Sequence, residues 1–510
     1  MIIDDKQYDV IIVGSGAGGG TLAQSLAVTG KQILVLERGG RMSLEDQNRA
    51  NIDVFKTSRY RSPEQWYDLT GEPFSPQANY AVGGNTKIYR ASLMRMRERD
   101  FEAVRYQDGI TPEWPIKYND FEPYYTAAEK LYQVHGNQKK DPTEPPHSGN
   151  YPHRASTHPP VMRPIVEKIA ATGLHPTTLP VSLTKRRDDP TGDSEVFGID
   201  LALKHQNVTL KTNAKVVELH TNASGNEIKG VQAQIGDEEL IFRSDIVVLA
   251  CGAVNSAALM LESANEKHPN GLANQSGMLG RNLMKHLMTV IVEPREANNK
   301  GTFPPSVSVN DFYWGDRNFP YPMGHIENTG GLLQDLIFAE SPPILSVIAR
   351  VLPGAGLKPL VRRSIGWWAQ TGTLPDPNNR IYWKKDTYFG YKRKKLCYEF
   401  MSNNWEAHDR LVYRWMEVLK EMENSSIGLR SGSLYPRGEA PVQVVGYQCG
   451  TARMGTDPAK SVLDINCRTH EIENLYVVDS SFFPSCASVS PALTVMANAL
   501  RVGQYLATQI

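Results

Sequence analysis

The first forty residues carry the feature that most constrains the fold of this chain. Tyr8–Val13 is a short, mainly apolar and β-branched run, which predicts a buried parallel strand. The loop at 14–19 reads GSGAGG and fits the pattern GxGxxG. Helical spacing follows over Leu22–Leu26, and a second strand is expected at Ile33–Leu36. This order of strand, glycine loop, helix and strand is typical of a dinucleotide-binding unit in a doubly wound α/β fold.

Each glycine of this loop has its own predicted role. Gly14 permits the tight turn, Gly16 lets a pyrophosphate approach the backbone, and Gly19 lets the helix pack closely on the strand. The helix that begins near Ala17 supplies N–H groups and a positive dipole end for phosphate. Glu37 lies 23 residues after Gly14, at the end of the second strand, and is expected to accept a hydrogen bond from a ribose hydroxyl.

Composition excludes several other classes of protein. A chain of 510 residues is expected to form about two to four domains. The 55 basic and 55 acidic residues balance, so no electrostatic case exists for nucleic acid. No apolar run approaches the ~20 residues of a membrane span, and Asp4 and Asp5 stand where a secretory signal would be basic. The five cysteines are scattered, which predicts a cytoplasmic protein with neither a disulfide framework nor a metal site.

The residue composition of the chain changes between about residues 300 and 440. Aromatic residues cluster near 312–321, and alternating segments such as Arg380–Lys384 follow. This composition predicts an antiparallel sheet with helices across it. We therefore expect an α/β nucleotide-binding domain from 1–300 and 441–510, with substrate-side segments inserted in the first part, and an α+β substrate domain at 301–440.

The stretch Ile344–Trp368 allows two interpretations. It combines an apolar face with four basic residues and ends in paired tryptophans. The interpretation we favour is a pair of helices packed on the domain with snorkelling cations. The alternative is an amphipathic segment that contacts a membrane or covers an apolar pocket.

Three segments near the C-terminus form a signature. Gly446–Gly455 reads GYQCGTARMG, Leu475–Ser480 reads LYVVDS, and Ser490–Arg501 reads SPALTVMANALR. This pattern resembles the C-terminal signature of the glucose–methanol–choline (GMC) flavin oxidoreductases. The resemblance covers nearly the whole chain. It implies FAD as cofactor, a Rossmann-like FAD domain, and a substrate domain of the p-hydroxybenzoate hydroxylase type whose antiparallel sheet lies over the flavin.

Further segments support FAD through the same resemblance. Ala81–Tyr89 (AVGGNTKIY) is similar to the family's second glycine motif, which follows the pyrophosphate and the flavin edge. Val216 lies in a predicted strand that meets the adenine in the family, and Asp245–Ala250 precedes a closing turn. The predicted FAD-binding residues are Gly14, Gly16, Ala17, Gly19, Glu37, Arg38, Gly83, Gly84, Asn85, Thr86, Val216, Cys251, Gly252, Asp479, Ser480, Pro491 and Thr494.

The last predicted helix has a mechanistic role if the family geometry holds. Ser490 is suited to the N-cap and Pro491 to the first helical position. The helix over 492–505 is apolar nearly all round and is expected to be buried. Its positive end would favour the negative charge of a reduced flavin.

The two positions that usually handle the substrate proton are altered. The family has a His where this chain has Tyr447, and a His or Asn where it has Ser490. A His can accept a proton near neutral pH, whereas a phenol has a reference pKa of about 10. Arg90 follows as a third candidate, because a guanidinium would attract a carboxylate or an anionic flavin. His325 and His286 are candidate replacements for the missing base.

We expect the first of three functions, and the other two are alternatives that the sequence leaves open. The first is FAD-dependent oxidation of a CH–OH group of a small molecule in an apolar or aromatic-lined pocket. The second is a non-standard flavin reaction, either a lyase reaction or light-driven radical chemistry on a carboxylate bound by Arg90. The third is a catalytically silent flavoprotein. The electron acceptor and the oligomeric state are left open as well.

Overall fold

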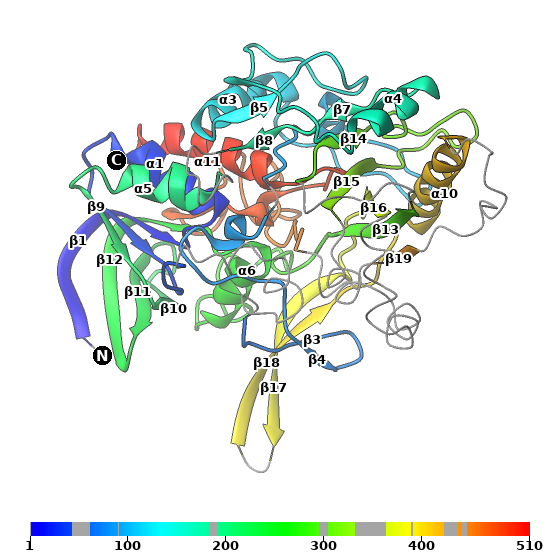
Figure 1. The fold of residues 1–510 in the computed structure, drawn as a ribbon. Helices are drawn as coiled ribbons and strands as arrows, with labels where there is room; N and C mark the ends of the chain where they lie inside the picture. The colour runs from blue at the N-terminus through cyan, green and yellow to red at the C-terminus, as the bar shows by residue number, and fades with distance from the viewer. Residues whose placement is uncertain are drawn as a thin grey trace, which may run out of the picture.

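Two large sheets organise the molecule (Figure 1). The computed structural model describes residues 2–42, 62–89, 91–183, 192–294, 304–331, 364–388, 391–422, 437–439 and 446–510. None of the helices in these ranges is long and apolar enough to cross a membrane.

The first sheet has seven strands in the order β10-β11-β12-β1-β2-β9, with β20 paired to β12. Strands β12, β1, β2 and β9 run parallel, and β20 runs parallel to β12. Its strands are β1 (Ile2–Val13), β2 (Ile33–Leu36), β9 (Val208–Lys211), β10 (Ala214–Thr221), β11 (Ile228–Ile235), β12 (Glu238–Leu249) and β20 (Leu475–Val477). The predicted strands at 8–13, 33–36, 214–219 and 245–250 are confirmed, and the apolar runs of β1, β2 and the end of β12 are buried inside the sheet.

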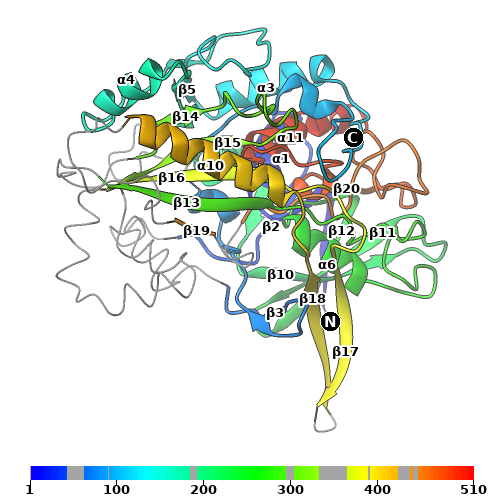
Figure 2. The same cartoon turned by 90° about the vertical axis from the view of Figure 1, so that its right-hand side faces the viewer.

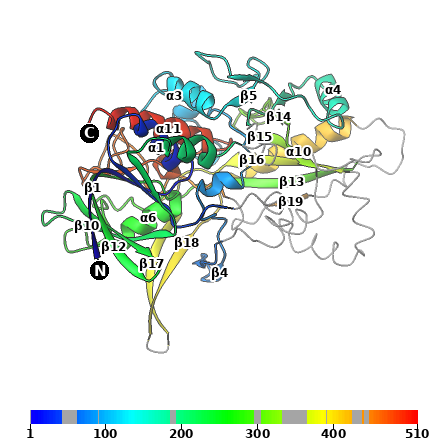
Figure 3. The same ribbon diagram turned by 60° about the vertical axis from the view of Figure 1, so that its left-hand side comes forward.

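Helices from both ends of the chain pack beside this sheet. Helix α1 (Ala17–Ala27) lies against α11 (Ala492–Leu506), and α11 lies against α3 (Tyr118–Leu131), as Figures 1 and 3 show. The predicted helix at 492–505 is confirmed. Its two faces are buried between α1 and α3, which explains why it is apolar nearly all round. The other α-helices of the described residues are α4 (Arg163–Ala171), α5 (Asp200–Ala202), α6 (Ala253–Glu262) and α10 (Trp405–Met422).

The second sheet has six antiparallel strands in the order β19-β13-β16-β15-β14-β7. Helix α10 crosses one face of it, as Figure 2 shows. The strands are β7 (Thr177–Thr178), β13 (His286–Pro294), β14 (Val307–Val309), β15 (His325–Gly331), β16 (Ser364–Gly372) and β19 (Arg437–Glu439). The expected antiparallel sheet with a helix across it is therefore present.

Strand β16 corrects the interpretation of Ile344–Trp368 at its C-terminal end. Ser364–Trp368 forms the first half of β16 and is buried throughout, so the paired tryptophans belong to a sheet and not to a helix. Alternation explains this, because successive side chains of a strand point to opposite faces, and Trp367 and Trp368 are both buried. Residues 344–363 lie outside the described residues.

Smaller elements complete the architecture. A hairpin of β17 (Arg380–Tyr388) and β18 (Tyr391–Glu399) projects from the body in all three views, and confirms the strand predicted at 380–384. It continues into a four-stranded sheet with β3 (Trp66–Tyr67) and β4 (Pro73–Phe74). A three-stranded sheet contains β5 (Val134–Gly136), β6 (His153–Arg154) and β8 (Val181–Ser182).

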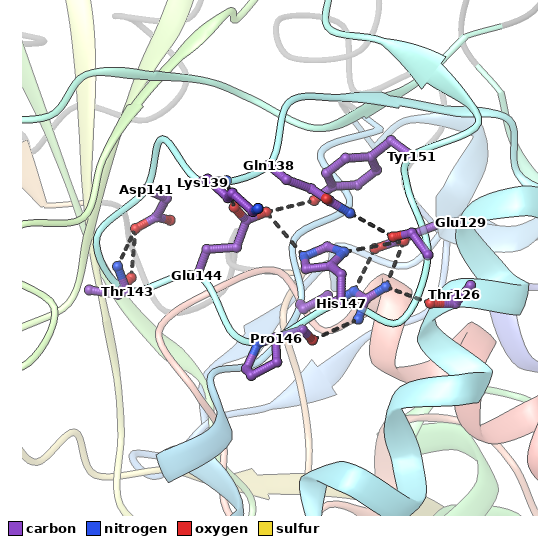
Figure 4. A network of polar contacts seen from close by, with 12 residues as sticks. Thr126, Glu129, Gln138, Lys139, Asp141, Thr143, Glu144, Pro146, His147 and Tyr151 are labelled. Atoms are coloured by element: carbon purple, nitrogen blue, oxygen red, sulfur yellow. Dashed lines mark hydrogen bonds and ion pairs between the residues drawn. The ribbon is translucent and has the colours of Figure 1, made fainter.

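A dense polar network joins α3 to the loop after β5. Figure 4 shows His147 between Glu129 and Glu144, with Thr126 and Tyr151 close by. The buried Arg95 guanidinium bonds Glu129 through two nitrogens, at 2.7 and 2.8 Å, and Glu122 at 2.8 Å. Removing one partner of such a buried pair is costly, because the other charge is then left buried and unpaired. The network therefore anchors the loop to α3.

Candidate functional site

A cavity of about 710 Å³ lies between the two large sheets. One end is lined by the carboxyl ends of β1, β2 and β12 and by the start of α1, and the other end by residues of β13, β15 and β16. In parallel α/β sheets, ligands collect at the carboxyl ends of strands. The cavity thus runs from the predicted nucleotide site to the antiparallel sheet.

The glycines of the first loop, together with Gly252 after β12, differ in the space that surrounds them. A Cβ on Gly14, whose φ is +100°, would stand 2.5 Å from the Ala250 carbonyl oxygen, and one on Gly19 would collide with the Gly14 carbonyl. A Cβ on Gly16 or on Gly252 would meet no atom within 4 Å, and both residues line the cavity. Gly14 and Gly19 are therefore required by chain packing, whereas Gly16 and Gly252 leave open space. That space fits an extended phosphate-bearing cofactor.

The start of α1 supplies the donors for such a group. Gly16 is the N-cap of α1, and no side chain caps the helix. Free N–H groups and the positive dipole end at this position favour an anion. The residues present at this end of the cavity therefore fit the pyrophosphate of FAD.

Glu37 closes the same end of the cavity. Its buried carboxylate accepts hydrogen bonds from the Ser15 N–H at 3.0 Å, the Ser15 hydroxyl at 2.6 Å and the Gly39 N–H at 2.9 Å. Burial raises its pKa although these bonds oppose the shift. A carboxylate has about four acceptor positions, so one remains for a ribose hydroxyl.

Arg38 belongs to a polar group at the outer edge of the cavity. Its guanidinium stacks 3.6 Å from the centre of the Tyr80 ring and pairs with Glu64. Lys215 also reaches Glu64, at 3.2 Å, and Val216 follows it in β10. These residues make a surface of mixed polarity beside the strand expected to meet the adenine.

Asp479 fixes the turn on the opposite side of the loop. Its carboxylate accepts from the Gly252 N–H at 3.0 Å, from the Ser481 N–H at 2.9 Å, and from the hydroxyls of Ser256 and Ser481. Burial raises the pKa of this carboxyl, opposed by the serine bonds. Asp479 thus holds β20 and the turn after β12 in register beside the cavity.

Most of the residues predicted from the sequence line the cavity. They are Gly14, Gly16, Ala17, Glu37, Arg38, Gly84, Asn85, Thr86, Val216, Cys251, Gly252, Tyr447, Asp479, Ser480, Ser490 and Pro491. Gly19, Gly83 and Thr494 do not line it, and the buried Thr494 hydroxyl instead bonds Tyr125 at 2.8 Å. Arg90 lies outside the described residues.

Ser490 is not the N-cap of α11, contrary to the sequence prediction. The helix begins at Ala492, and Pro491 occupies the N-cap in helical conformation without a side-chain cap. Proline has a fixed φ near −65°, which suits the residue just before the helix as well as the first residue in it. Ser490 and Pro491 both line the cavity, so the uncapped start of α11 faces it.

The far end of the cavity contains residues that the sequence interpretation missed. Met288, Glu327 and Trp368 line it together with Tyr447 and Ser490. Trp368 is paired with Glu327 on β15, and Met288 lies on the neighbouring β13. The alternation of side chains along these strands is the signal that could have indicated them, but it requires the pairing register.

His325 is in contact with Glu327 on the same strand, β15, but does not line the cavity. Its Nε2 is 3.2 Å from the Glu327 carboxylate, and its Nδ1 is 2.7 Å from Oδ1 of Asn310. The Asn310 amide nitrogen bonds Asp141, so its oxygen faces the imidazole and Nδ1 must carry a proton. The Glu327 carboxylate lies at the other ring nitrogen, Nε2.

His286 is likewise in contact with a residue that lines the cavity, Tyr447. The two rings are 4.9 Å apart between centres, and His286 Nε2 is 3.3 Å from Sγ of Cys486. Burial acts to lower the His286 pKa, but the Cys486 thiol raises it above its ordinary value. Neither histidine lines the cavity itself, so each would act through the residue in front of it.

Comparison with known proteins assigns the chain to a family. Two family models described as GMC oxidoreductase match it, one over residues 8–288 and the other over residues 403–499. The chain is 26% identical to 6'''-hydroxyparomomycin C oxidase of Streptomyces lividus, across 99% of this chain and 92% of that protein. It is 25% identical to the fructose dehydrogenase large subunit of Gluconobacter japonicus, across 97% and 96%.

Solved structures share the fold. Pyridoxine 4-oxidase from Mesorbium loti superposes with a TM-score of 0.69 at 17% identity, across 98% of this chain and 99% of that one. Formate oxidase superposes with a TM-score of 0.71 at 14% identity, across 99% of both chains. The expected combination of a Rossmann-like FAD domain and a substrate domain is therefore confirmed, and this chain, an FAD-dependent oxidoreductase, belongs to the GMC oxidoreductase family.

Proposed function

We propose that this enzyme oxidises a CH–OH group of a small hydroxylated molecule, with Glu327 as the proton acceptor and His325 as its partner. The observation that carries the proposal is the Glu327 carboxylate at the far end of the cavity, 3.2 Å from a histidine whose other nitrogen is already committed to Asn310. A carboxylate held in this way can take the hydroxyl proton that a His takes at the Tyr447 position in the family.

The cofactor would lie along the cavity. Gly16 and the start of α1 would hold the pyrophosphate, Glu37 a ribose hydroxyl, and Val216 the adenine side. Tyr447 and Ser490 would flank the ring system. FAD supplies the two-electron hydride acceptor, and the protein supplies orientation and the proton acceptor.

Different parts of the chain are assigned to the cofactor and to the substrate. We assign 1–300 and 441–510 to FAD binding and 301–440 to the substrate. Strands β7 and β13 are the substrate-side insertions, because they belong to the same sheet as β14, β15 and β16. The described cysteines are free thiols, which suits the cytoplasm.

The wall of the cavity suggests the class of substrate. Trp368, Tyr447 and Met288 offer apolar and aromatic surface, and Glu327 offers one negative charge. By their names, similar proteins act on paromamine, on fructose and on 2-methyl-1,2-propanediol. A sugar, amino sugar or diol would place its ring or carbon chain on the aromatic surface and its hydroxyl at Glu327. The similarity to oxidases and dehydrogenases favours this reaction over the lyase, light-driven and silent alternatives.

Glu327→Gln tests the proposal. The variant keeps a hydrogen bond to His325 but loses the basic oxygen, so we expect kcat/KM for the best alcohol of a sugar, amino sugar and diol panel to fall by about 10²–10⁴-fold. Anaerobic bleaching of the flavin band measures the half-reaction without a second substrate. The bound flavin spectrum should stay unchanged.

Glu293→Gln is the matched control. Glu293 is a buried carboxylate in the same sheet, but it accepts from Trp367 Nε1 at 2.9 Å and does not line the cavity. Its substitution should leave kcat/KM within about threefold. A Glu327→Gln enzyme with normal turnover would refute the assignment of the base, and a panel without any bleaching would refute alcohol oxidation.

A further inference from the structure

Two cysteines and a histidine form a compact group just behind the cavity wall. Sγ of Cys449 is 3.6 Å from Sγ of Cys486, and Cys486 Sγ is 3.3 Å from Nε2 of His286. All three side chains are buried. The proton transfer proposed above at Glu327 uses none of them, so their proximity needs a separate explanation.

Three segments fix this group in place. The backbone of Cys449 exchanges two hydrogen bonds with Met284, at 2.9 and 3.0 Å, immediately before β13 begins at His286. On the other side, a Cβ on Gly372 would stand only 2.5 Å from the Cys486 carbonyl oxygen, and Gly372 is the strand partner of His286. Both thiols are therefore held at the same corner of the six-stranded sheet.

The electrostatics of the group favour a thiolate on one cysteine. The hydrogen bond from Cys449 and the nearby His286 lower the pKa of the Cys486 thiol, although burial opposes this. Burial raises the pKa of the Cys449 thiol. The two thiol pKa values are thus shifted in opposite directions, which is the asymmetry of an attacking and a resolving cysteine.

We propose that Cys449 and Cys486 are a redox-active pair that a hydroperoxide converts to a disulfide, with His286 as the proton acceptor for Cys486. A disulfide requires a sulfur separation of about 2.05 Å, so the two atoms must approach by roughly 1.5 Å. Rotation about the side-chain torsions of two neighbouring cysteines can provide such a movement.

The reaction balances in two steps. His286 takes the thiol proton of Cys486, and the thiolate attacks one peroxide oxygen; the O–O bond breaks, and the leaving oxygen departs as water or an alcohol after it takes that proton. Cys486 is then a sulfenic acid. The Cys449 sulfur attacks it, the S–OH bond breaks, water leaves with the Cys449 proton, and the S–S bond forms. The pair loses two electrons and two protons in all.

Oxidation would change the cavity wall. Cys449 follows Gln448 and Tyr447, which both line the cavity, and the Tyr447 ring packs on His286. Drawing the sulfurs together moves Cys449 and removes the thiol that bonds His286. The oxidation state of the two cysteines therefore affects the packing around Tyr447, the residue at the family's catalytic position.

Mass spectrometry of the purified holoenzyme without any alcohol tests the pair directly. After treatment with hydrogen peroxide, acid quenching and alkylation, we expect three alkylated cysteines instead of the five in the sequence. A peptide linking residues 449 and 486 should appear, and dithiothreitol should restore five. Because no substrate is present, this result does not depend on the proposed alcohol oxidation.

Single substitutions separate the steps. Cys449→Ser should stop at a sulfenic acid on Cys486 that dimedone traps, and Cys486→Ser should keep four free thiols. His286→Gln should slow disulfide formation by about tenfold or more. Cys467→Ser is the matched control: Cys467 is also buried but bonds Asn498 and Arg501, so the 449–486 link should still form.

The exposed Met401 provides an internal measure of the peroxide dose, because its side chain is oxidised without access to the interior. If Met401 is converted to the sulfoxide while all five thiols remain free, the proposal is wrong. Preferential oxidation of Cys251 or Cys397, or an unchanged rate in His286→Gln, would equally overturn it.

Discussion

The six-stranded sheet presents two faces with opposite chemistry, although the same strands form both. On the face under α10, buried polar side chains bond one another: His408 bonds Thr289 at 2.8 Å and Thr371 at 2.9 Å, and Trp367 bonds Glu293. On the face toward the cavity, residues one position along the same strands are Met288, Trp368 and Glu327, and they line open space.

The difference shows how one sheet separates stability from chemistry. A helix laid across a face buries the side chains beneath it, and the burial there contributes to folding. The other face keeps its acceptors and aromatic surface for a ligand. Neighbouring residues in sequence therefore have unrelated roles, and substitutions at adjacent positions test this directly.

The paired tryptophans should show the largest contrast. Trp367→Ala removes a fully buried ring that stacks edge to face on Trp415 at 4.7 Å and leaves the Glu293 carboxylate without its indole donor. We expect the free energy of unfolding to fall by about 3–5 kcal/mol. Trp368→Ala enlarges an existing cavity, so the loss should be roughly half of that or less, and KM should rise.

Denaturant titration of both variants, followed by steady-state kinetics, measures this contrast. Flavin content should be determined for each preparation so that KM is compared between fully loaded enzymes. Equal losses of stability, or an unchanged KM in Trp368→Ala, would contradict the separation of the two faces.

His408, on the face under α10, should make the free energy of unfolding depend on pH. Burial lowers its pKa to about 3, below its ordinary value of about 6.5, so the unfolded chain takes up the proton first as the pH falls. The stabilisation is complete above pH ~6.5 and is lost toward pH ~3. At pH 4.5 the loss from this residue should be about 3 kcal/mol.

His408→Gln keeps hydrogen bonding to the threonines but cannot be protonated. The difference in unfolding free energy between pH 7 and pH 4.5 should therefore be about 3 kcal/mol smaller in the variant than in the wild type. Identical pH dependence in the two proteins would show that His408 is not held neutral by the fold.

On the cavity side, Tyr447→Phe should alter activity without altering stability. The ring stays packed on His286, and only the hydroxyl is lost. We expect kcat/KM to fall by up to about tenfold, equivalent to about 1.4 kcal/mol, with the unfolding free energy changed by less than about 0.5 kcal/mol. A stability loss with normal kinetics would assign Tyr447 to the structure and not to the site.

The smallest effect is expected for Ser490→Ala. A serine at a true N-cap contributes about 0.5–2 kcal/mol, but α11 has Pro491 at that position and no side-chain cap. The unfolding free energy should therefore change by less than about 0.5 kcal/mol. A fall of 1 kcal/mol or more in the free energy of unfolding, measured by thermal or denaturant unfolding, would show that Ser490 does cap α11.

The local part of the fold and of the site was predictable from the sequence. The strand at 33–36 and the roles of Gly14 and Gly19 follow from patterns that span only a few residues. The start of α11 was misplaced by one residue because proline is compatible with both positions. The paired tryptophans were misassigned because a short apolar run does not distinguish a strand from a helix.

The substrate end of the site could not be predicted in the same way. Glu327 and Trp368 are 41 positions apart and become neighbours only through the register of β15 on β16. His286 and Cys486 are 200 positions apart, and their contact depends on the packing of separate segments at one corner of the sheet. Register and packing are non-local, so composition and periodicity do not encode them.

By itself, the sequence determined the nucleotide loop and the glycines that the chain needs to turn and pack there. The tertiary structure decided which carboxylate faces the cavity and which thiols meet. The physical reason is that backbone conformation responds to neighbouring residues, whereas proton transfer and sulfur chemistry require side chains from distant strands within about 4 Å.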